Sequence, residues 1–368
     1  MGLLASALPG AVLYGYYLLS AAALAVPTFF IVQETLEIAG ILGVKETRAL
    51  WYLVATPSFL FMVLLNWYVI GVFFMVYGLR KFLQGSYRWS GFLLGLSAAS
   101  NLVTAVPALG MLMSLRDRRD AVAFVLAALG CFLAINAPFF AVNPGLWLSF
   151  WRYESSWYIE GSWMLALLGS YSPLRHYIFP ISFVLLCALI FWLSRRRGLT
   201  DVVSLTWLTT FAFFASTYVF TPQMQLVLLP FFVLTPIAKR YWEFLAFDIL
   251  NSLFIVLAFS EVLLPFGISY SFGVSAYGDP VRWLAIVRSL WVVKFLAVDG
   301  LLPFAPGRVQ RLAVSLRLLP RGGPTMPLPA SPPSSAEEGG PEPRAGATSL
   351  KYVRSTRHSG ASDGDQQR

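Results

Sequence analysis

The sequence is poor in charged residues and in cysteine. Only 12% of its 368 residues are charged, whereas 57% are hydrophobic, and this charged share is about half that of a typical soluble domain. The balance excludes an ordinary water-soluble protein and favours a chain whose solvent is the lipid bilayer. The two cysteines, Cys131 and Cys187, both lie inside apolar runs. We therefore expect small buried side chains there, and neither a disulfide framework nor a metal site.

Long apolar runs recur along the chain, and several reach the ~20 residues that a helix needs to cross a bilayer. Examples are Ala121–Val142, Leu174–Leu193, Val202–Phe220 and Phe244–Phe266. The alternating pattern of a membrane β-barrel is absent, and irregular backbone cannot face lipid. We therefore predict an all-α, polytopic integral membrane protein with about 8–10 transmembrane or re-entrant helices.

Short basic clusters separate the apolar runs, and we assign them to the cytoplasmic side because Lys and Arg are enriched in loops there. The net charge of +9 then reflects topology and does not indicate nucleic-acid binding. This assignment predicts a multi-pass protein of the cell membrane with an outer N-terminus and a cytoplasmic C-terminus. The clusters are Lys45/Arg48, Arg80/Lys81/Arg88, Arg116/Arg118/Arg119, Arg195–Arg197, Lys239/Arg240 and, near the C-terminus, Arg308, Arg311, Arg317 and Arg321.

The piece Trp89–Leu115 has bases at both ends, so a single span would put one basic cluster outside. We prefer a hairpin of two short helices that turns near Asn101–Pro107, with a simple span as the alternative. Such a turn is tolerated at membrane depth where protein or a wet cavity surrounds it. The spans before it, Leu50–Leu65 and Tyr68–Leu79, should be short, with Asn66-Trp67 at the outer turn.

We divide the chain into a polytopic membrane domain, 1–305, and a C-terminal segment, 306–368. Arg308–Leu319 has the pattern of a short basic amphipathic helix at the inner interface. From Pro320 the composition turns to Pro, Gly, Ser and charged residues, which cannot build a core. We therefore predict a disordered cytoplasmic tail.

Polar and aromatic residues concentrate in segments that this topology puts outside. The loop Asn143–Pro173 is rich in tryptophan, and an amphipathic helix with an aromatic belt is the simplest explanation. Stacking on sugar rings is the alternative for one or two of these tryptophans. Arg175-His176 begins the next span, where arginine either grips a lipid phosphate or extends to headgroups.

Placing an ionisable residue at membrane depth costs free energy, so ionisable residues inside the apolar runs suggest a functional site. For Asp248, pairing with Lys239 or Arg240 is the simpler explanation. Lys294 and Asp299 stand five residues apart in the last run, a spacing that does not suit pairing on an α-helix.

Four segments, in this order, are similar to motifs of a known family. They are Ala55-Thr56-Pro57 with Asn66-Trp67-Tyr68; Gly91–Asn101 with Pro107; Asn136-Ala137-Pro138 with Asn143–Trp147 and Phe150–Arg152; and Thr221–Gln225 with Pro230. The matching motifs read aP…NWD, aGxLLGLaaatKxyP, NlPf…pegWwxFyrf and SPQYxlWllP. Over about Ala11–Ile237 the chain thus resembles the polytopic GT-C glycosyltransferases that depend on polyprenyl-phosphate mannose (family GT87).

The resemblance implies a helical membrane fold with the active site at the outer face. It implies that a sugar moves from a polyprenyl phosphate to a glycan or glycolipid with inversion, and that a carboxylate deprotonates the acceptor hydroxyl. Basic residues would hold the lipid phosphate, so no metal or other cofactor is firmly implied. The lipid-linked sugar is the donor substrate, and the oligomeric state is left open.

The sequence departs from the family at its acidic positions. The aspartate of NWD is Tyr68 here, and the lysine of the second motif is Asn101. The family's first span and acidic outer loop have no counterpart, because the matching stretch, Ala7–Gly10, begins almost at Met1. Either the start is misassigned or truncated, or this chain has lost the catalytic loop.

Candidate site residues are therefore chosen by side and charge as well as by motif. Glu154 and Glu160 are the candidate bases, and Arg152, Arg175, His176 and Gln223 are candidate ligands of the donor phosphate. The substrate cavity should be lined by Asn66, Trp67, Tyr68, Asn101, Thr221 and Pro222.

The predicted activity is that of an inverting, mannose-type hexosyltransferase of the cell envelope. One alternative is a non-catalytic GT-C-like partner, which the missing acids favour. The other is a lipid or solute transporter, which predicts an internal repeat that the sequence does not show convincingly.

Overall fold

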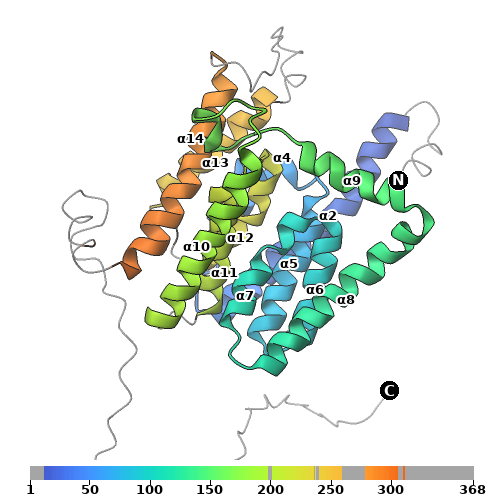
Figure 1. Cartoon of the computed structure of the whole chain (residues 1–368), viewed down its shortest axis with the longest axis vertical. Helices are drawn as coiled ribbons and strands as arrows, with labels where there is room; N and C mark the ends of the chain where they lie inside the picture. Colours follow the sequence, from blue (N-terminus) through green and yellow to red (C-terminus); the bar gives the residue numbers. More distant parts are fainter. Residues whose placement is uncertain are drawn as a thin grey trace, which may run out of the picture. The chain divides into compact units, whose positions relative to one another are not determined.

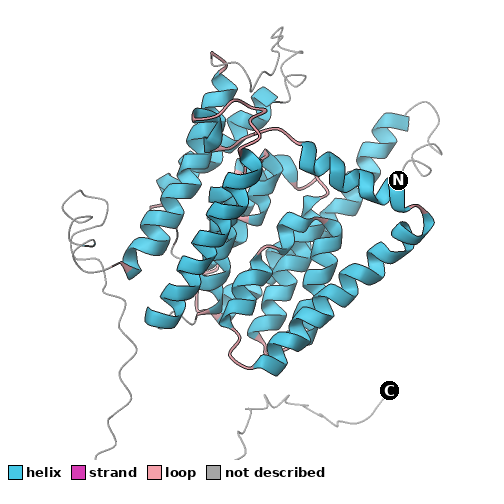
Figure 2. Cartoon of the chain, viewed as in Figure 1, coloured by secondary structure: helices cyan, strands magenta, loops and turns pink. Residues whose placement is uncertain are grey.

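The structure is a computed structural model that describes residues 12–197, 201–235, 237, 240–258, 278–305 and 310. This part of the chain is all-helical and contains no β-strand (Figure 2). The all-α part of the prediction is therefore confirmed. Ala7–Gly10, Lys239, the end of the predicted run Phe244–Phe266 and most of the C-terminal segment lie outside the described residues.

Three helices of the described chain are long and apolar enough to cross a membrane: α2 (Val12–Ile41), α8 (Arg118–Val142) and α10 (Arg175–Arg197). All three are arranged with the shorter helices in one bundle (Figure 1). Their outward sides are apolar, as Leu126 on α8 and Leu185 on α10 are both more than half exposed. So much exposed apolar surface on helices of this length needs a cover other than water.

The other predicted spans are shorter or interrupted helices. The run 50–65 is divided at Thr56, whose side chain accepts a hydrogen bond from the Phe59 N–H, while Pro57 occupies the first helical position. The shorter elements are α3 (Thr47–Ala49), η1 (Leu50–Val54), α4 (Pro57–Met62), α5 (Tyr68–Leu83), α6 (Tyr87–Ser100), η2 (Leu102–Ala105), α7 (Pro107–Ser114), α9 (Pro144–Ser156), η3 (Trp163–Ala166), α11 (Val202–Ser216), η4 (Pro222–Val227), α12 (Leu229–Leu234), α13 (Tyr241–Ala258), α14 (Pro280–Lys294), η6 (Phe295–Leu301) and η7 (Leu302–Phe304).

The predicted helical hairpin is confirmed as two short helices, α6 and α7, separated by η2. Asn101 ends α6, and its side-chain oxygen accepts the Val103 N–H at 2.9 Å. Arg88, at the start of α6, lines the same open cavity as Arg118 and Arg119, which follow α7. The two basic ends of the hairpin therefore lie together, as the charge pattern required.

Glycines bring α6 against α8. A Cβ atom added to Gly91 would lie 2.2 Å from the Phe124 carbonyl oxygen, and one added to Gly95 would lie 2.5 Å from that of Ala128. Small residues at such positions let two helix backbones approach closely, which is typical of helix packing in membranes.

The core of the bundle is aromatic. The Phe295 ring centroid lies 5.2 Å from that of Phe232, 5.8 Å from that of Phe247 and 6.4 Å from that of Phe211, and all four side chains are buried. These residues come from η6, α12, α13 and α11, so this cluster joins the second half of the chain into one unit.

The expectation that Lys294 and Asp299 are poorly spaced to pair is wrong. The Lys294 Nζ lies 3.2 Å from an Asp299 carboxylate oxygen and 2.6 Å from one of Glu243. The reason is that Phe295–Leu301 is a π-helix. Its i→i+5 geometry makes residues five apart neighbours, which the α-helical spacing rule does not consider.

Candidate functional site

The segment between α8 and α10 begins with α9, which leaves the end of α8 at a steep angle (Figure 1). None of its residues is buried. The Trp147 indole N–H donates to the Asn136 side chain at 3.0 Å and so ties α9 back to α8. The predicted helix in this tryptophan-rich loop is therefore present, and its place at a membrane interface stays a prediction.

The candidate site residues of the following loop converge on Tyr218, which the sequence patterns did not single out. The Glu160 N–H donates to the Tyr218 carbonyl oxygen at 2.9 Å. The His176 ring centroid lies 5.7 Å from that of Tyr218, and the Arg175 Cζ lies 5.9 Å from the same ring centroid. Glu154 acts electrostatically on the Tyr218 hydroxyl. We call this group, with Trp157, the Tyr218 cluster.

Backbone hydrogen bonds fix Glu160 beside the end of α11. Glu160 and Val219 form an isolated parallel bridge, in which the Phe220 N–H donates to the Glu160 carbonyl oxygen at 2.7 Å. Gly161 follows with φ +68°, and a Cβ atom there would lie 2.1 Å from the Phe220 carbonyl oxygen. Only glycine combines this backbone angle with this close approach. The loop conformation that presents Glu160 is thus specified locally.

The Glu160 carboxylate is half-buried and accepts the Trp157 indole N–H at 2.7 Å. Burial raises the pKa of this carboxyl above its ordinary value, and the Trp157 hydrogen bond and the Arg288 charge offset part of that increase. A carboxylate with a raised pKa is a stronger proton acceptor, and a general base works best when its pKa approaches the working pH. Glu160 therefore has the environment of a base.

Glu154 has a different environment, because it is exposed on the last turn of α9. Its charge acts on the hydroxyl groups of both Tyr68 and Tyr218. The Tyr68 hydroxyl is hydrogen-bonded to the Asn101 side chain. The structure thus brings together the two positions at which the sequence departs from the family motifs.

Arg175 is engaged by the protein backbone. Its guanidinium donates to the carbonyl oxygens of Trp157 at 3.0 Å, Ser172 at 2.8 Å and Tyr171 at 3.1 Å, and only 8% of the residue is exposed. These contacts tie the loop to the start of α10 and favour a structural role. The neighbouring His176, another of the four predicted phosphate ligands, is exposed and stands next to Tyr218, so it is more accessible than Arg175.

The remaining predicted site residues differ in how far they are exposed to solvent. Trp67 is 46% exposed, and Asn66 accepts the Tyr68 N–H at 2.9 Å at the start of α5. Arg152 is exposed on α9 and Gln223 is half-buried, whereas Thr221 and Pro222 are buried. The first part of the predicted lining is thus accessible, and the Thr221-Pro222 part is covered by protein.

A buried polar network extends from the Tyr218 cluster into the bundle, and its centre is Arg288 on α14. This side chain is fully buried and donates to the Asn251 side-chain oxygen and to the carbonyl oxygens of Phe220 and Gly161. Its Cζ also lies 4.2 Å from the Phe220 ring centroid and 4.6 Å from that of Phe254. A buried charge persists where such partners replace its hydration.

The network continues through α13 to two segments that were singled out by motif. The Asn251 amide donates to the Ser58 hydroxyl at 2.9 Å and to the Pro222 carbonyl oxygen at 3.2 Å. Asp248 accepts the Gln225 amide at 2.8 Å and the Ser58 N–H at 3.3 Å. The motif-like segments around Pro57 and Pro222 are therefore joined through buried side chains of α13.

The expected pairing of Asp248 with Arg240 is wrong. Asp248 is fully buried and bonded to Ser58 and Gln225, whereas Arg240 is exposed. Lys239, the other expected partner, lies outside the described residues. Its partners, the Ser58 backbone N–H and the Gln225 side-chain amide, come from positions 190 and 23 residues away, so the charges near Asp248 in the sequence do not indicate them.

Arg288 could have been found in the sequence, because an arginine inside an apolar run of 283–304 is itself a signal of function. Tyr218 carried no such signal. Among the residues that the structure describes, no group of three His, Cys, Asp or Glu side chains could hold a metal ion.

No protein-family model matches the chain, and neither a curated protein nor a solved structure matches it.

Proposed function

We propose that the protein is a polytopic membrane glycosyltransferase of the GT-C kind. It would transfer a mannose-like sugar from a polyprenyl phosphate to a glycan or glycolipid acceptor of the cell envelope, at the extracytoplasmic face. The observation that carries the proposal is the environment of Glu160, a half-buried carboxylate with a raised pKa that accepts the Trp157 indole N–H and feels the Arg288 charge within the Tyr218 cluster. This is the residue type and environment that an acceptor-activating base requires.

The helices support the membrane part of the proposal. The three long apolar helices expose large hydrophobic side chains, including Leu133 and Phe139 on α8 and Val184 on α10. The free energy of exposing these side chains is lower in lipid than in water. Arg288 and Asp248 are buried within the bundle, which is where membrane proteins keep their ionisable groups.

The Tyr68–Asn101 contact supports the resemblance to the GT-C family. An aspartate and a lysine at these two positions, as the family motifs have them, would be near enough to interact. Tyrosine and asparagine replace that charged pair with a neutral hydrogen bond. The two departures from the family motifs are thus neighbours in space. Neither Tyr68 nor Asn101 supplies a carboxylate, and Glu160 is the residue best placed to act as the general base.

The proposed reaction assigns separate roles to the cluster. Glu160 takes the proton of an acceptor hydroxyl as the acceptor oxygen attacks the anomeric carbon. The bond between that carbon and the phosphate oxygen breaks on the opposite face, which inverts the anomeric centre, and polyprenyl phosphate leaves with the electron pair. The His176 imidazole can donate a hydrogen bond to the phosphate and so stabilise part of its charge. Trp157 orients Glu160 through its indole N–H.

The test is transfer by the purified protein in detergent or lipid nanodiscs. Radiolabelled polyprenyl-phosphate mannose and a radiolabelled nucleotide sugar are each supplied with a short mannoside acceptor. We expect label to move to the acceptor from the polyprenyl donor and not from the nucleotide sugar. Transfer from the nucleotide sugar alone would contradict the proposed donor class.

A second candidate function is a non-catalytic GT-C-like partner that binds the lipid-linked sugar. The presence of Tyr68 where the family has an aspartate favours it. The same preparation separates the two, because a binding partner retains the labelled donor on the protein without transferring its sugar to any acceptor supplied.

A further inference from the structure

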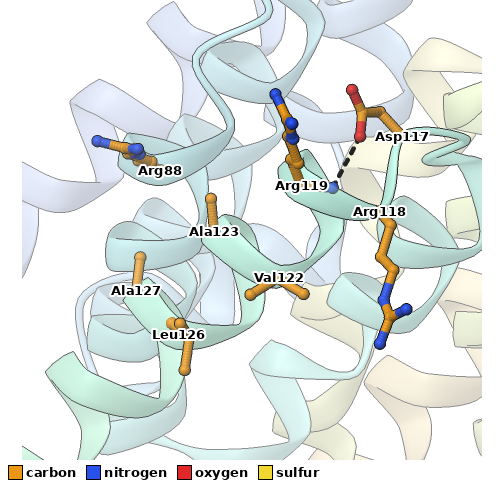
Figure 3. A pocket seen from close by; sticks show the side chains of 8 residues that line it. All are labelled: Arg88, Asp117, Arg118, Arg119, Val122, Ala123, Leu126 and Ala127. Atoms are coloured by element: carbon orange, nitrogen blue, oxygen red, sulfur yellow. Dashed lines mark hydrogen bonds between the residues drawn. The ribbon is translucent and has the colours of Figure 1, made fainter.

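An open cavity of about 990 Å³ lies at the start of α8. Its walls come from the starts of α6 and α8 (Figure 3). We call it the arginine pocket, and it is lined by Arg88, Asp117, Arg118, Arg119, Val122, Ala123, Leu126 and Ala127. Because α8 has 25 residues, its two ends are about 37 Å apart. The arginine pocket and α9 are therefore at opposite ends of this helix, and the pocket is separate from the Tyr218 cluster.

The charge of the arginine pocket is positive. Three guanidinium groups line it, and its one carboxylate, Asp117, accepts the Arg119 backbone N–H at 2.7 Å and so caps α8 (Figure 3). A smaller adjoining cavity shares Arg88 and Arg119 and adds Asp120. Even with both aspartates counted, the arginines remain in excess. All three are exposed, so they are available to an anion.

The floor of the arginine pocket is apolar and continues into the exposed side of α8. Val122 and Leu126 are 48% and 62% exposed, and Ala123 and Ala127 are half-buried beside α6. The alanines leave a shallow groove where Gly91 draws the two helices together. A ligand that fits here has an anionic end for the arginines and an apolar body for the helix surface.

We propose that the arginine pocket binds an anionic phospholipid, with its phosphate between Arg88 and Arg119 and an acyl chain along Ala123 and Leu126. Basic pockets between membrane helices commonly bind anionic headgroups. The inference rests on the membrane part of the proposed function and is independent of sugar transfer.

Native mass spectrometry of the purified, delipidated protein tests this inference. The protein is titrated in detergent with phosphatidylglycerol or with phosphatidylcholine. We expect tighter binding of phosphatidylglycerol, and a loss on the order of tenfold or more in the double variant Arg88→Gln/Arg119→Gln, because each basic group near an anionic lipid contributes a severalfold gain. The matched control is Arg195→Gln/Arg196→Gln, which removes the same charge from exposed positions at the end of α10.

A second pair of variants tests the groove without changing charge. Ala123→Leu should fill the groove and weaken phosphatidylglycerol binding, whereas Val125→Leu, on an exposed part of α8, should not. Equal binding of the two lipids by the unmodified protein would overturn the proposal. Equal losses in the two arginine double variants would also overturn it, because binding would then follow net charge alone. Neither result would alter the outcome of the transfer assay.

Discussion

Replacing Glu160 with glutamine should lower the rate of sugar transfer by about 10²–10⁴-fold, the usual contribution of a general base. Glutamine keeps the shape of the side chain and an oxygen that can accept the Trp157 N–H, but it cannot take a proton. The measurement is kcat for transfer from polyprenyl-phosphate mannose. The control is Glu154→Gln, which changes an exposed carboxylate on α9 and should cost only a few-fold. The reverse order of losses would move the base to Glu154.

The pH dependence of sugar transfer tests the role of Glu160 as the base independently. Burial raises the Glu160 pKa, so transfer should fall as the pH is lowered through a value above that of an ordinary glutamate. The pH dependence of folding stability has the opposite sign to that of transfer. A carboxyl whose pKa is raised by folding contributes stability below its unfolded pKa, and that contribution is lost as the pH rises through the folded pKa. Glu160→Gln should therefore not destabilise the protein at neutral pH, and loss of transfer through unfolding would contradict this account.

Replacing Arg288 with methionine should destabilise the bundle by about 3–5 kcal/mol, the cost of removing one member of a buried charged network. Methionine fills much of the volume but leaves the Asn251 side-chain oxygen and the Phe220 carbonyl oxygen without their donor. Glu160 also loses its counter-charge. For a bundle of this size the midpoint of thermal unfolding should fall by roughly 10 °C.

Thermal unfolding in detergent, followed by tryptophan fluorescence, measures this loss. Arg152→Met is the matched control, because Arg152 is exposed on α9, and its effect should stay within about 0.5 kcal/mol. An Arg288→Met protein that unfolds at the temperature of the unmodified protein would show that the buried network does not hold these segments together.

The sequence predicted the helices well where one physical effect dominates. Long apolar runs gave α8 and α10, and the basic residues at the two ends of 89–115 predicted the hairpin of α6 and α7. Thr56-Pro57 has the residues of a helix start, and a helix does start there. These features depend on near neighbours in the chain, which is why composition and spacing are sufficient to find them.

The candidate site was predictable only in part, because its contacts join distant segments. Glu160 was selected by charge and predicted side, yet its backbone pairs with Val219, 59 positions away, and that pairing makes Tyr218 the centre of the cluster. Asp248 was noticed, but its partners are neutral and remote. The Lys294–Asp299 pair depends on a π-helix, which the sequence pattern did not indicate.

The central claim is that the bundle crosses a membrane and presents the Tyr218 cluster on the outer side. It is tested most directly by cysteine labelling at Arg152 on α9 and Arg118 at the start of α8, which are both exposed. The native Cys131 and Cys187 are buried and give a low background. In intact cells a membrane-impermeant maleimide should label the Arg152→Cys protein and should label the Arg118→Cys protein only after permeabilisation. Labelling at position 118 in intact cells, or equal labelling at both positions, would contradict the claim.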